Sequence, residues 1–321
     1  MEGGWSNATL ESLQKASADG VFMNCASGCS SANSISFKIT DEVGNLHQAE
    51  YIKVVAAFFN KEAEANRIFE AKVTAYQALK VSAPSTTVAW ISYEPASSWN
   101  LGESFLLSRA DYKLQMVTDA GYTNVDLAAL QTALPKLTAD TTVTAGTKYI
   151  LKVADYASKQ AAAEAFSAAL SGVSVVIDEI YAPDPTAYDL NTFYANYHLS
   201  SGSAHSFMQR VLRIDGTMSS DKNLDWFESR VANPEWALEG LRRSVTGDAS
   251  LRRKYFRNIA RSVAPEVLDH SMCSVDMPSC GAFLPTIILR DGALPAEASS
   301  AKAPAGAAAL ALSLLALGLR A

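Results

Sequence analysis

The sequence predicts an α/β protein with two parallel-sheet lobes joined by a long backbone helix, the first lobe being incomplete. Residues 51–80 contain no Gly or Pro and repeat apolar residues every three or four positions, which is the period of one helix face. Residues 83–200 alternate β-branched runs with helical segments, the pattern of a parallel sheet. Residues 5–19 have the pattern of a helix already inside a domain, so we expect the first lobe to lack its beginning.

The expected helix over residues 51–80 would be about 45 Å long at 1.5 Å per residue. A helix of that length between two mixed segments suggests a spine between two lobes. The predicted division of the chain is a first-lobe remnant (1–50), the backbone helix (51–82), the second lobe (83–200), a C-terminal helical region returning to the first lobe (201–290), and a linker with an anchor signal (291–321).

In the second lobe, candidate ligand-binding residues gather where predicted strands end. The strands are expected at 86–92, 148–153 and 173–177, and the helices at 109–120, 126–137 and 158–170. In open α/β sheets ligands bind beyond the carboxyl ends of the strands. The candidates there and in the loop after the first strand are Tyr93, Glu94, Trp99, Tyr156, Asp178, Glu179 and Tyr181. Each aromatic residue alone is more often core packing, and adjacent carboxylates on a strand point to opposite faces.

Composition places the chain among globular proteins. It has 321 residues, 49% of them hydrophobic and 19% charged, with a net charge of −6 and a pI near 5.3. An acidic chain argues against a nucleic-acid partner, because such binding depends on basic patches. The basic residues between 210 and 261 are interleaved with acidic ones, which favours a solvated helical face over an anion site.

Three features point to the secretory pathway. The cysteines form two local pairs, Cys25 with Cys29 and Cys273 with Cys280 in sequence order, and four cysteines permit three disulfide pairings. Neither spacing completes a zinc signature. Asn7 heads an Asn-Ala-Thr glycosylation acceptor.

The third feature is the C-terminus, where small residues, a spacer and the apolar run 307–319 follow one another. This is the signal for a GPI anchor, attached at Ser299 or Ser300, with the tail removed. The alternative is a buried or tail-anchoring helix. The N-terminus has no basic and apolar leader, so no signal peptide is present in this chain, and we expect its start to be missing.

The order of elements resembles the helical-backbone class of periplasmic substrate-binding proteins. The similarity covers roughly residues 10–270 and rests most on FNKEAEAN at 59–66 and DYKLQMVTDAGYTNV at 111–125. That class serves bacterial importers of iron-siderophores, cobalamin and some metals, and holds its ligand between two lobes. The resemblance implies a small-molecule ligand, with a metal chelate as one form of it and an importer partner of unknown identity. The short first lobe and the eukaryotic anchor signal depart from the class.

No catalytic motif in the sequence supports an enzymatic function. It has no G-x-S-x-G nucleophile elbow, Gly-rich dinucleotide fingerprint or P-loop. His198 and His205 lack a third metal ligand nearby, so no metal site or cofactor is predicted. We expect a cell-surface solute-binding protein. The alternatives are a structural or adhesive surface glycoprotein without a ligand, and an extracellular hydrolase whose site the sequence does not reveal.

Overall fold

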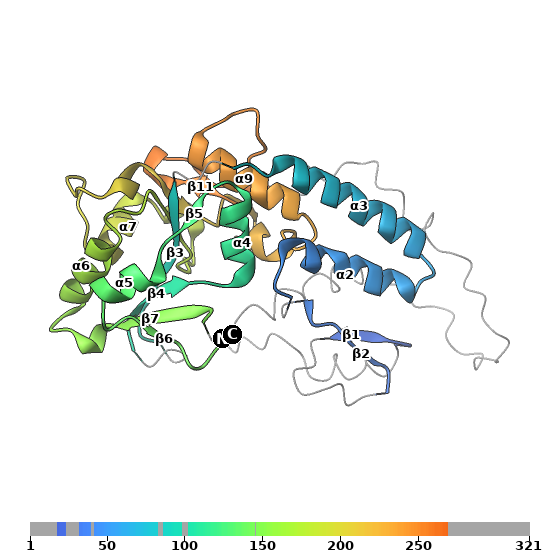
Figure 1. Cartoon of the computed structure of the whole chain (residues 1–321), viewed down its shortest axis with the longest axis horizontal. Coiled ribbons are helices and arrows are strands. Elements are labelled where there is room, and N and C mark those ends of the chain that lie inside the picture. Colours follow the sequence, from blue (N-terminus) through green and yellow to red (C-terminus); the bar gives the residue numbers. More distant parts are fainter. Residues whose placement is uncertain are drawn as a thin grey trace.

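The computed structural model describes residues 18–23, 32–39, 42–82, 86–97, 102–144 and 146–268 (Figure 1). Several predicted sites lie outside these residues: Asn7, Cys25, Cys29, Trp99, Cys273, Cys280, Ser299 and Ser300. The glycosylation, disulfide and lipid-anchor assignments therefore stay predictions.

The body of the protein is built on an eight-stranded sheet with the order β11–β9–β8–β3–β4–β7–β6, and β5 pairs with β3 beside this path. The strands are β3 (Thr87–Glu94), β4 (Ser104–Ser108), β5 (Thr123–Asn124), β6 (Thr138–Ala139), β7 (Lys148–Lys152), β8 (Val175–Asp178), β9 (Val211–Arg213) and β11 (Arg257–Asn258). Only the pairs of β3 with β5, β3 with β8, and β8 with β9 are parallel. The predicted α/β class is confirmed, but the sheet is mixed rather than parallel.

The central strand β3 has a different core on each of its faces. Its side chains alternate, so that Ala89, Ile91 and Tyr93 enter one apolar cluster while Val88 and Trp90 enter the other. This alternation is the period-two geometry of a strand. Since both faces are covered, residues 88–91 in the middle of the strand are all apolar, as in other buried strands.

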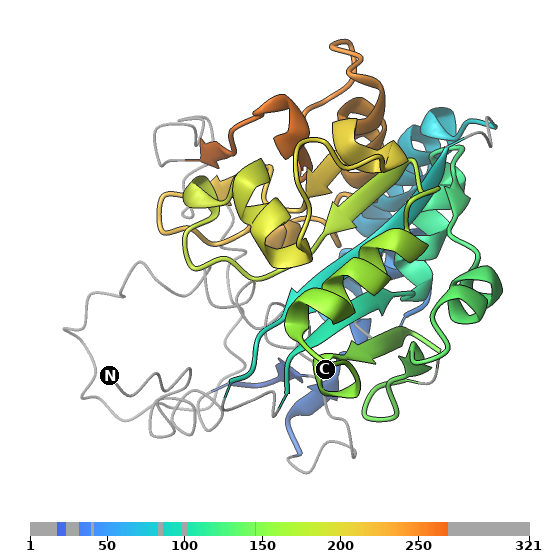
Figure 2. The ribbon, with the colours of Figure 1, turned by 90° about the vertical axis from the view of Figure 1, so that its left-hand side faces the viewer.

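Helices cover both faces of the sheet. Leu130 of α5, Phe166 of α6 and Phe193 of α7 pack on the face of Ile91, which is the side that Figure 2 presents to the viewer. On the opposite face lie α3, α4 and α9. The helices are α3 (Glu62–Leu79), α4 (Asp111–Asp119), α5 (Leu127–Ala133), α6 (Lys159–Ala169), α7 (Leu190–Tyr197) and α9 (Pro234–Thr246).

Local signals in the sequence set the ends of these helices. The side chains of Asp126, Ser158 and Asp189 accept hydrogen bonds from the first turns of α5, α6 and α7, which satisfies amides that the helix itself leaves unpaired. Gly121, with φ of 83°, follows α4, as expected for a helix-stop residue. The patterns of the sequence do not predict the strands β4, β5, β6, β9 and β11. Of these, β4 lies antiparallel between β3 and β7.

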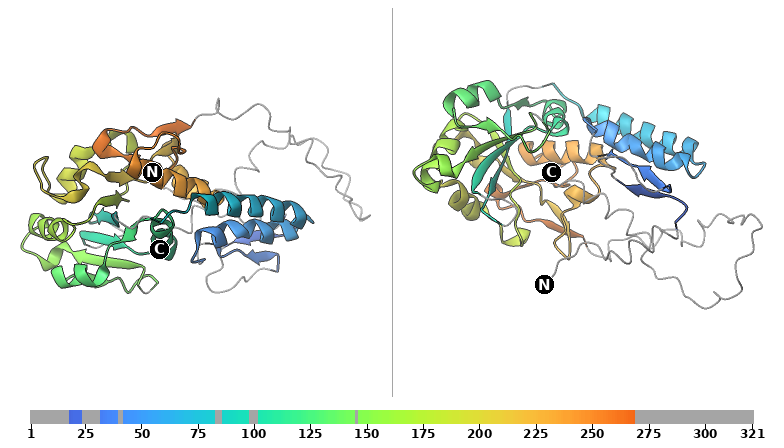
Figure 3. Two further views of the ribbon diagram at one scale, coloured as in Figure 1. Left: turned by 45° about the horizontal axis from the view of Figure 1, so that its top comes forward. Right: turned by 90° about the horizontal axis from the view of Figure 1, so that it is seen from below.

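The single long helix expected over residues 51–80 is wrong. The structure has two helices there, α2 (Asn45–Ala57) and α3, which lie side by side in Figures 1 and 3. The chain turns between them at residues 58–61, where Asn60 has φ of 52°. Asn tolerates this left-handed conformation better than most residues. Phe58 and Phe59 continue the apolar pattern of the sequence but lie exposed in this turn, so the pattern gives no sign of it.

The α3 helix is fixed to the body of the protein by polar contacts as well as packing. The hydroxyl of the fully buried Tyr76 donates to the Asp119 carboxylate at 2.8 Å, on α4. Lys72 makes a 3.1 Å salt bridge with Glu235 of α9. The α3 helix therefore packs against α4 and α9 on the Trp90 side of the sheet.

Two smaller parallel pairs complete the described chain. β1 (Val21–Met23) pairs with β2 (Ser34–Ser36) near α2, and β10 (Thr217–Ser219) pairs with β12 (Glu266–Leu268). Short helices follow at α8 (Asp225–Glu228), η2 (Val153–Asp155), η3 (Pro185–Ala187), η4 (Ser206–Gln209) and η5 (Ile259–Arg261). The helical region predicted over 201–290 is wrong for the described residues 201–268. In that stretch β9 and β11 belong to the main sheet, and only α8 and α9 are α-helices.

Candidate functional site

Asp178, the last residue of β8, lies at the centre of a buried network. Its side chain is 0% exposed and accepts hydrogen bonds from the hydroxyls of Tyr188 at 2.6 Å and Tyr197 at 3.1 Å. Arg213 of β9 donates to it at 3.2 Å. Burial raises the pKa of Asp178, and the Arg213 charge and the two hydroxyls oppose that shift. The carboxylate is enclosed by these protein groups and no surface of it faces solvent.

The network continues from Arg213 into a charge-balanced chain. Arg213 donates from Nε to Asp215 at 2.6 Å, and Arg257 of β11 donates to the same carboxylate at 2.5 Å. A second nitrogen of Arg257 bonds the backbone carbonyls of Pro185 and Tyr188. Two buried cations thus pair with two buried carboxylates. Such pairing is needed because an unpaired buried charge is strongly destabilising. The network joins β8, β9, β11 and the loop after β8.

Tyr93 and its neighbours at the end of β3 are also engaged with protein groups. Tyr93 packs in the core on the α6 side, and its hydroxyl donates to Glu103 at 2.6 Å. Glu94 lies 3.6 Å from the ammonium of Lys148. The ammonium of Lys136 lies 4.4 Å from the centroid of the Tyr156 ring. Ligand contact by Glu94 and Tyr156 stays a prediction.

The structure separates the predicted residues after β8. Tyr181 is 74% exposed, whereas Asp178 is sealed in its network and Glu179 makes a salt bridge of 2.6 Å to Lys113. Of these three neighbouring side chains, one is exposed to solvent, one is buried in a hydrogen-bonded network and one is held in a salt bridge. The described members of the predicted set do not converge on one cavity, and Glu179 is the member that leads to a further polar cluster.

We call this the junction cluster, made up of Trp90, Lys113, Glu179, Trp226 and Arg230. Lys113 lies in the first turn of α4, and its Nζ is 5.3 Å from the centre of the Trp90 ring. The Trp90 and Trp226 rings are 5.8 Å apart. Burial alone would lower the pKa of Lys113, but the Glu179 carboxylate outweighs it and the pKa is raised. Four separate elements, β3, α4, α8 and the end of β8, thus meet at one place.

Arg230 is the other cation of the junction cluster and is only 2% exposed. Its Nη1 donates to the side-chain oxygen of Gln48, on α2, at 3.1 Å. The guanidinium lies 4.4 Å from the Tyr112 ring centre and 4.9 Å from that of Trp226. Burial lowers the pKa of Arg230. Among the described residues no carboxylate forms a salt bridge with it.

Sequence reasoning did not find Lys113, Arg230 or the two tryptophans of the junction cluster. Arg230 falls in the basic stretch between 210 and 261, which was interpreted as a solvated face because acidic residues alternate with the basic ones. Its burial depends on Gln48, 182 positions earlier in the chain. No local signal in the sequence reports such a contact.

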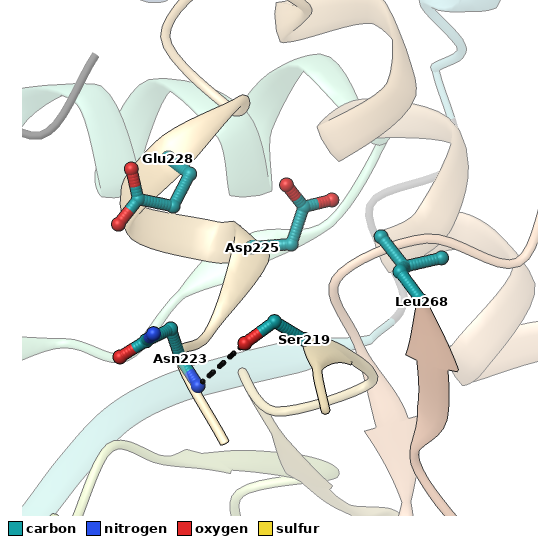
Figure 4. A pocket seen from close by; sticks show the side chains of 5 residues that line it. All are labelled: Ser219, Asn223, Asp225, Glu228 and Leu268. Atoms are coloured by element: carbon teal, nitrogen blue, oxygen red, sulfur yellow. Dashed lines mark hydrogen bonds between the residues drawn. The ribbon is translucent and has the colours of Figure 1, made fainter. Parts of the chain in front are cut away.

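The cavities lie apart from the predicted residues. One, of about 230 Å³, is lined by Ser219, Asn223, Asp225, Glu228 and Leu268 (Figure 4). Burial, and secondarily the neighbouring Asp225, raises the pKa of Glu228. Lys254 already pairs with Asp225 at 2.5 Å. A second hollow, of about 540 Å³, lies along α2 and the residues before it, with Glu42, His47, Glu50, Tyr51, Lys53 and Val54 around it.

The described part of the chain contains no set of three or more His, Cys, Asp or Glu side chains placed to hold a metal ion. Within the same residues, none of the helices has the length and apolar character needed to cross a bilayer.

Among known proteins, several solved structures are similar to this chain. No protein-family model and no curated protein matches the chain. An ABC transporter substrate-binding protein from Listeria monocytogenes EGD-e is 15% identical over 74% of this chain and 81% of its own, with a TM-score of 0.42. A periplasmic heme binding protein from Pseudomonas aeruginosa is 11% identical over 79% and 73%, with a TM-score of 0.41.

A possible iron-binding, periplasmic solute-binding protein from Staphylococcus epidermidis ATCC 12228 is 11% identical over 74% of this chain and 79% of its own, with a TM-score of 0.42. All three are described as binding proteins, the broad class that the order of elements resembles. At these TM-scores and identities the similarity concerns the arrangement of elements and assigns no role to any residue of this chain.

Proposed function

We propose that this protein is a non-enzymatic solute-binding protein whose ligand is held at the junction cluster. The observation that carries the proposal is the convergence there of two buried cations, one carboxylate and two tryptophans from separate elements. Binding sites for small molecules combine such apolar walls with a few placed polar groups. The position next to the carboxyl end of β8 is also where α/β folds bind ligands.

The location of the protein is part of the same proposal. A GPI anchor at Ser299 or Ser300 would hold the chain on the cell surface. A glycan on Asn7 and disulfides among the four cysteines would form on the way through the secretory pathway. Release of the protein from intact cells by a phosphatidylinositol-specific phospholipase C tests the anchor. Retention on the cells after that treatment would contradict it.

A second candidate function is a structural or adhesive surface glycoprotein without a ligand. The enclosure of Asp178 and Tyr93 by protein groups favours it, because two of the predicted ligand contacts then serve stability. Binding measurements separate the two functions.

The test uses heme, ferric chelates, cobalamin and divalent metal ions as probes, with thermal unfolding and tryptophan fluorescence as readouts. A ligand at the junction cluster should raise the melting temperature, since anything that binds only the folded state stabilises it. It should also change the emission, because Trp90 and Trp226 lie in the cluster. The emission change should be reduced in Trp226→Phe and kept in Trp236→Phe, a matched tryptophan that packs against Arg252 outside the cluster. If no probe changes either readout, binding of these ligand classes is refuted.

A further inference from the structure

Arg230 presents one edge of its guanidinium without a partner. Nη1 is bonded to Gln48, but Nε and Nη2 are both buried and have no hydrogen-bond partner among the described residues. In a guanidinium these two nitrogens form one planar edge, and their parallel N–H groups match the two oxygens of a carboxylate. The unpartnered edge therefore has the geometry of a bidentate carboxylate site.

The charge balance of the junction cluster also favours a bound anion. The only carboxylate of the junction cluster is Glu179, and it is committed to Lys113 at 2.6 Å. The cluster thus contains two cations and one anion, with an excess of one positive charge. A buried, unpaired cation is unfavourable, and the tyrosine and tryptophan rings beside Arg230 offset this only in part. One bound monoanion would balance the charge.

The residues around Arg230 indicate which kind of anion it would bind. The rings of Tyr112 and Trp226 flank the guanidinium, so a ligand bound to its edge would contact aromatic faces and should itself have an apolar or aromatic body. Trp90 Nε1 is a further buried donor that has no hydrogen-bond partner in the described part of the chain. Among the described residues, the one hydrogen-bond partner of the Arg230 guanidinium is the neutral amide of Gln48 on α2, which leaves its charge unbalanced.

We propose that Arg230 binds the carboxylate of a small organic monocarboxylic acid with an apolar body, through its Nε and Nη2 atoms. This inference rests on the proposed solute-binding function and names the class of ligand. A ligand held in this way forms two charge-assisted hydrogen bonds, which discriminate strongly against a neutral analogue of the same shape.

The test compares benzoate with benzamide, its neutral counterpart, at constant ionic strength set by chloride, using calorimetric titration and thermal unfolding. We expect benzoate to bind and benzamide to bind roughly 10- to 100-fold more weakly. Arg230→Met should lose the preference for benzoate, whereas Arg230→Lys should keep only part of it because it retains the charge without the planar edge. Arg252→Met is the matched control, since Arg252 is half-exposed and pairs with Glu239, and it should bind like the wild type.

Equal binding of benzoate and benzamide by the wild type would overturn the inference, and this comparison needs no folded Arg230 variant. Unchanged benzoate binding in Arg230→Met or Arg230→Lys would also overturn it, as would equal stabilisation by chloride or inorganic phosphate. If heme, a chelate, cobalamin or a metal binds at the junction cluster but benzoate does not, the inference fails and the proposed function stands. If none of the probes binds, both fail.

Discussion

Asp178→Asn is the perturbation whose magnitude the structure defines best. The substitution keeps the shape of the side chain but removes its charge from the buried network. Arg213 would then rely on Asp215 alone, and that carboxylate is already shared with Arg257. Two buried cations would face one carboxylate, and leaving a buried charge uncompensated costs about 3 to 5 kcal/mol.

The geometry places the expected loss near the lower end of that range. An Asn oxygen can still accept from Tyr188 or Tyr197, which now donate to the carboxylate at 2.6 and 3.1 Å. The Asn amide group, however, can only donate and would face Arg213, which also donates. We expect the free energy of unfolding to fall by about 3 kcal/mol, a large part of the 5 to 15 kcal/mol typical of folded domains.

Urea denaturation followed by far-ultraviolet circular dichroism measures this loss. Tyr197→Phe removes one hydroxyl from the same carboxylate and should cost about 1 kcal/mol, so it provides a milder variant if Asp178→Asn does not fold. Glu64→Gln is the matched control, because Glu64 belongs to an exposed pair with Lys61 and should leave the midpoint unchanged. A loss below about 1 kcal/mol in Asp178→Asn would refute the account of Asp178 as a structural residue.

Three further predictions concern single local features. Hydrogen bonds from Lys222 and Thr186 lower the pKa of Asp184 from 3.8 to about 2, so its stabilising contribution is lost as the pH falls from about 4 to about 2; carbon-detected NMR titration should show the pKa rise in Lys222→Gln, and an unchanged value would contradict the pairing. Asn60→Val should destabilise the protein by about 1 to 2 kcal/mol because of its positive φ, while Asn60→Gly should not, as thermal melts can check. Ser158→Ala removes the N-cap of α6 and should cost about 1 kcal/mol in urea unfolding; no loss would mean that another group caps the helix.

Local patterns predicted the strands β3, β7 and β8 of the main sheet and the helices α4, α5 and α6. The run at 86–92 predicted β3 because β-branched and aromatic side chains suit a strand buried on both faces. The alanine-rich segment after Ser158 predicted α6, and Gly121 predicted the end of α4. In each case the deciding interactions join residues close in sequence, so the sequence records them directly.

The candidate site was predicted far less well than the fold. Of the expected ligand contacts, Asp178 and Tyr93 are enclosed in protein contacts, because a strand end can face a neighbouring loop as easily as solvent. Glu179 alone led to the junction cluster, through its salt bridge with Lys113. Arg230 was grouped with solvated charges, since charge alternation alone does not distinguish an exposed arginine from one that packing has buried.

The sequence by itself determined the α/β class, the central strand and the helices α4, α5 and α6, because each depends on short-range periodicity or composition. Only the tertiary structure decided that the chain turns at Asn60 and that β4 lies antiparallel beside β3. It also decided that Arg230 meets Gln48 with one guanidinium edge unpartnered. These features depend on packing and charge between segments distant in the chain, for which a one-dimensional pattern carries no signal.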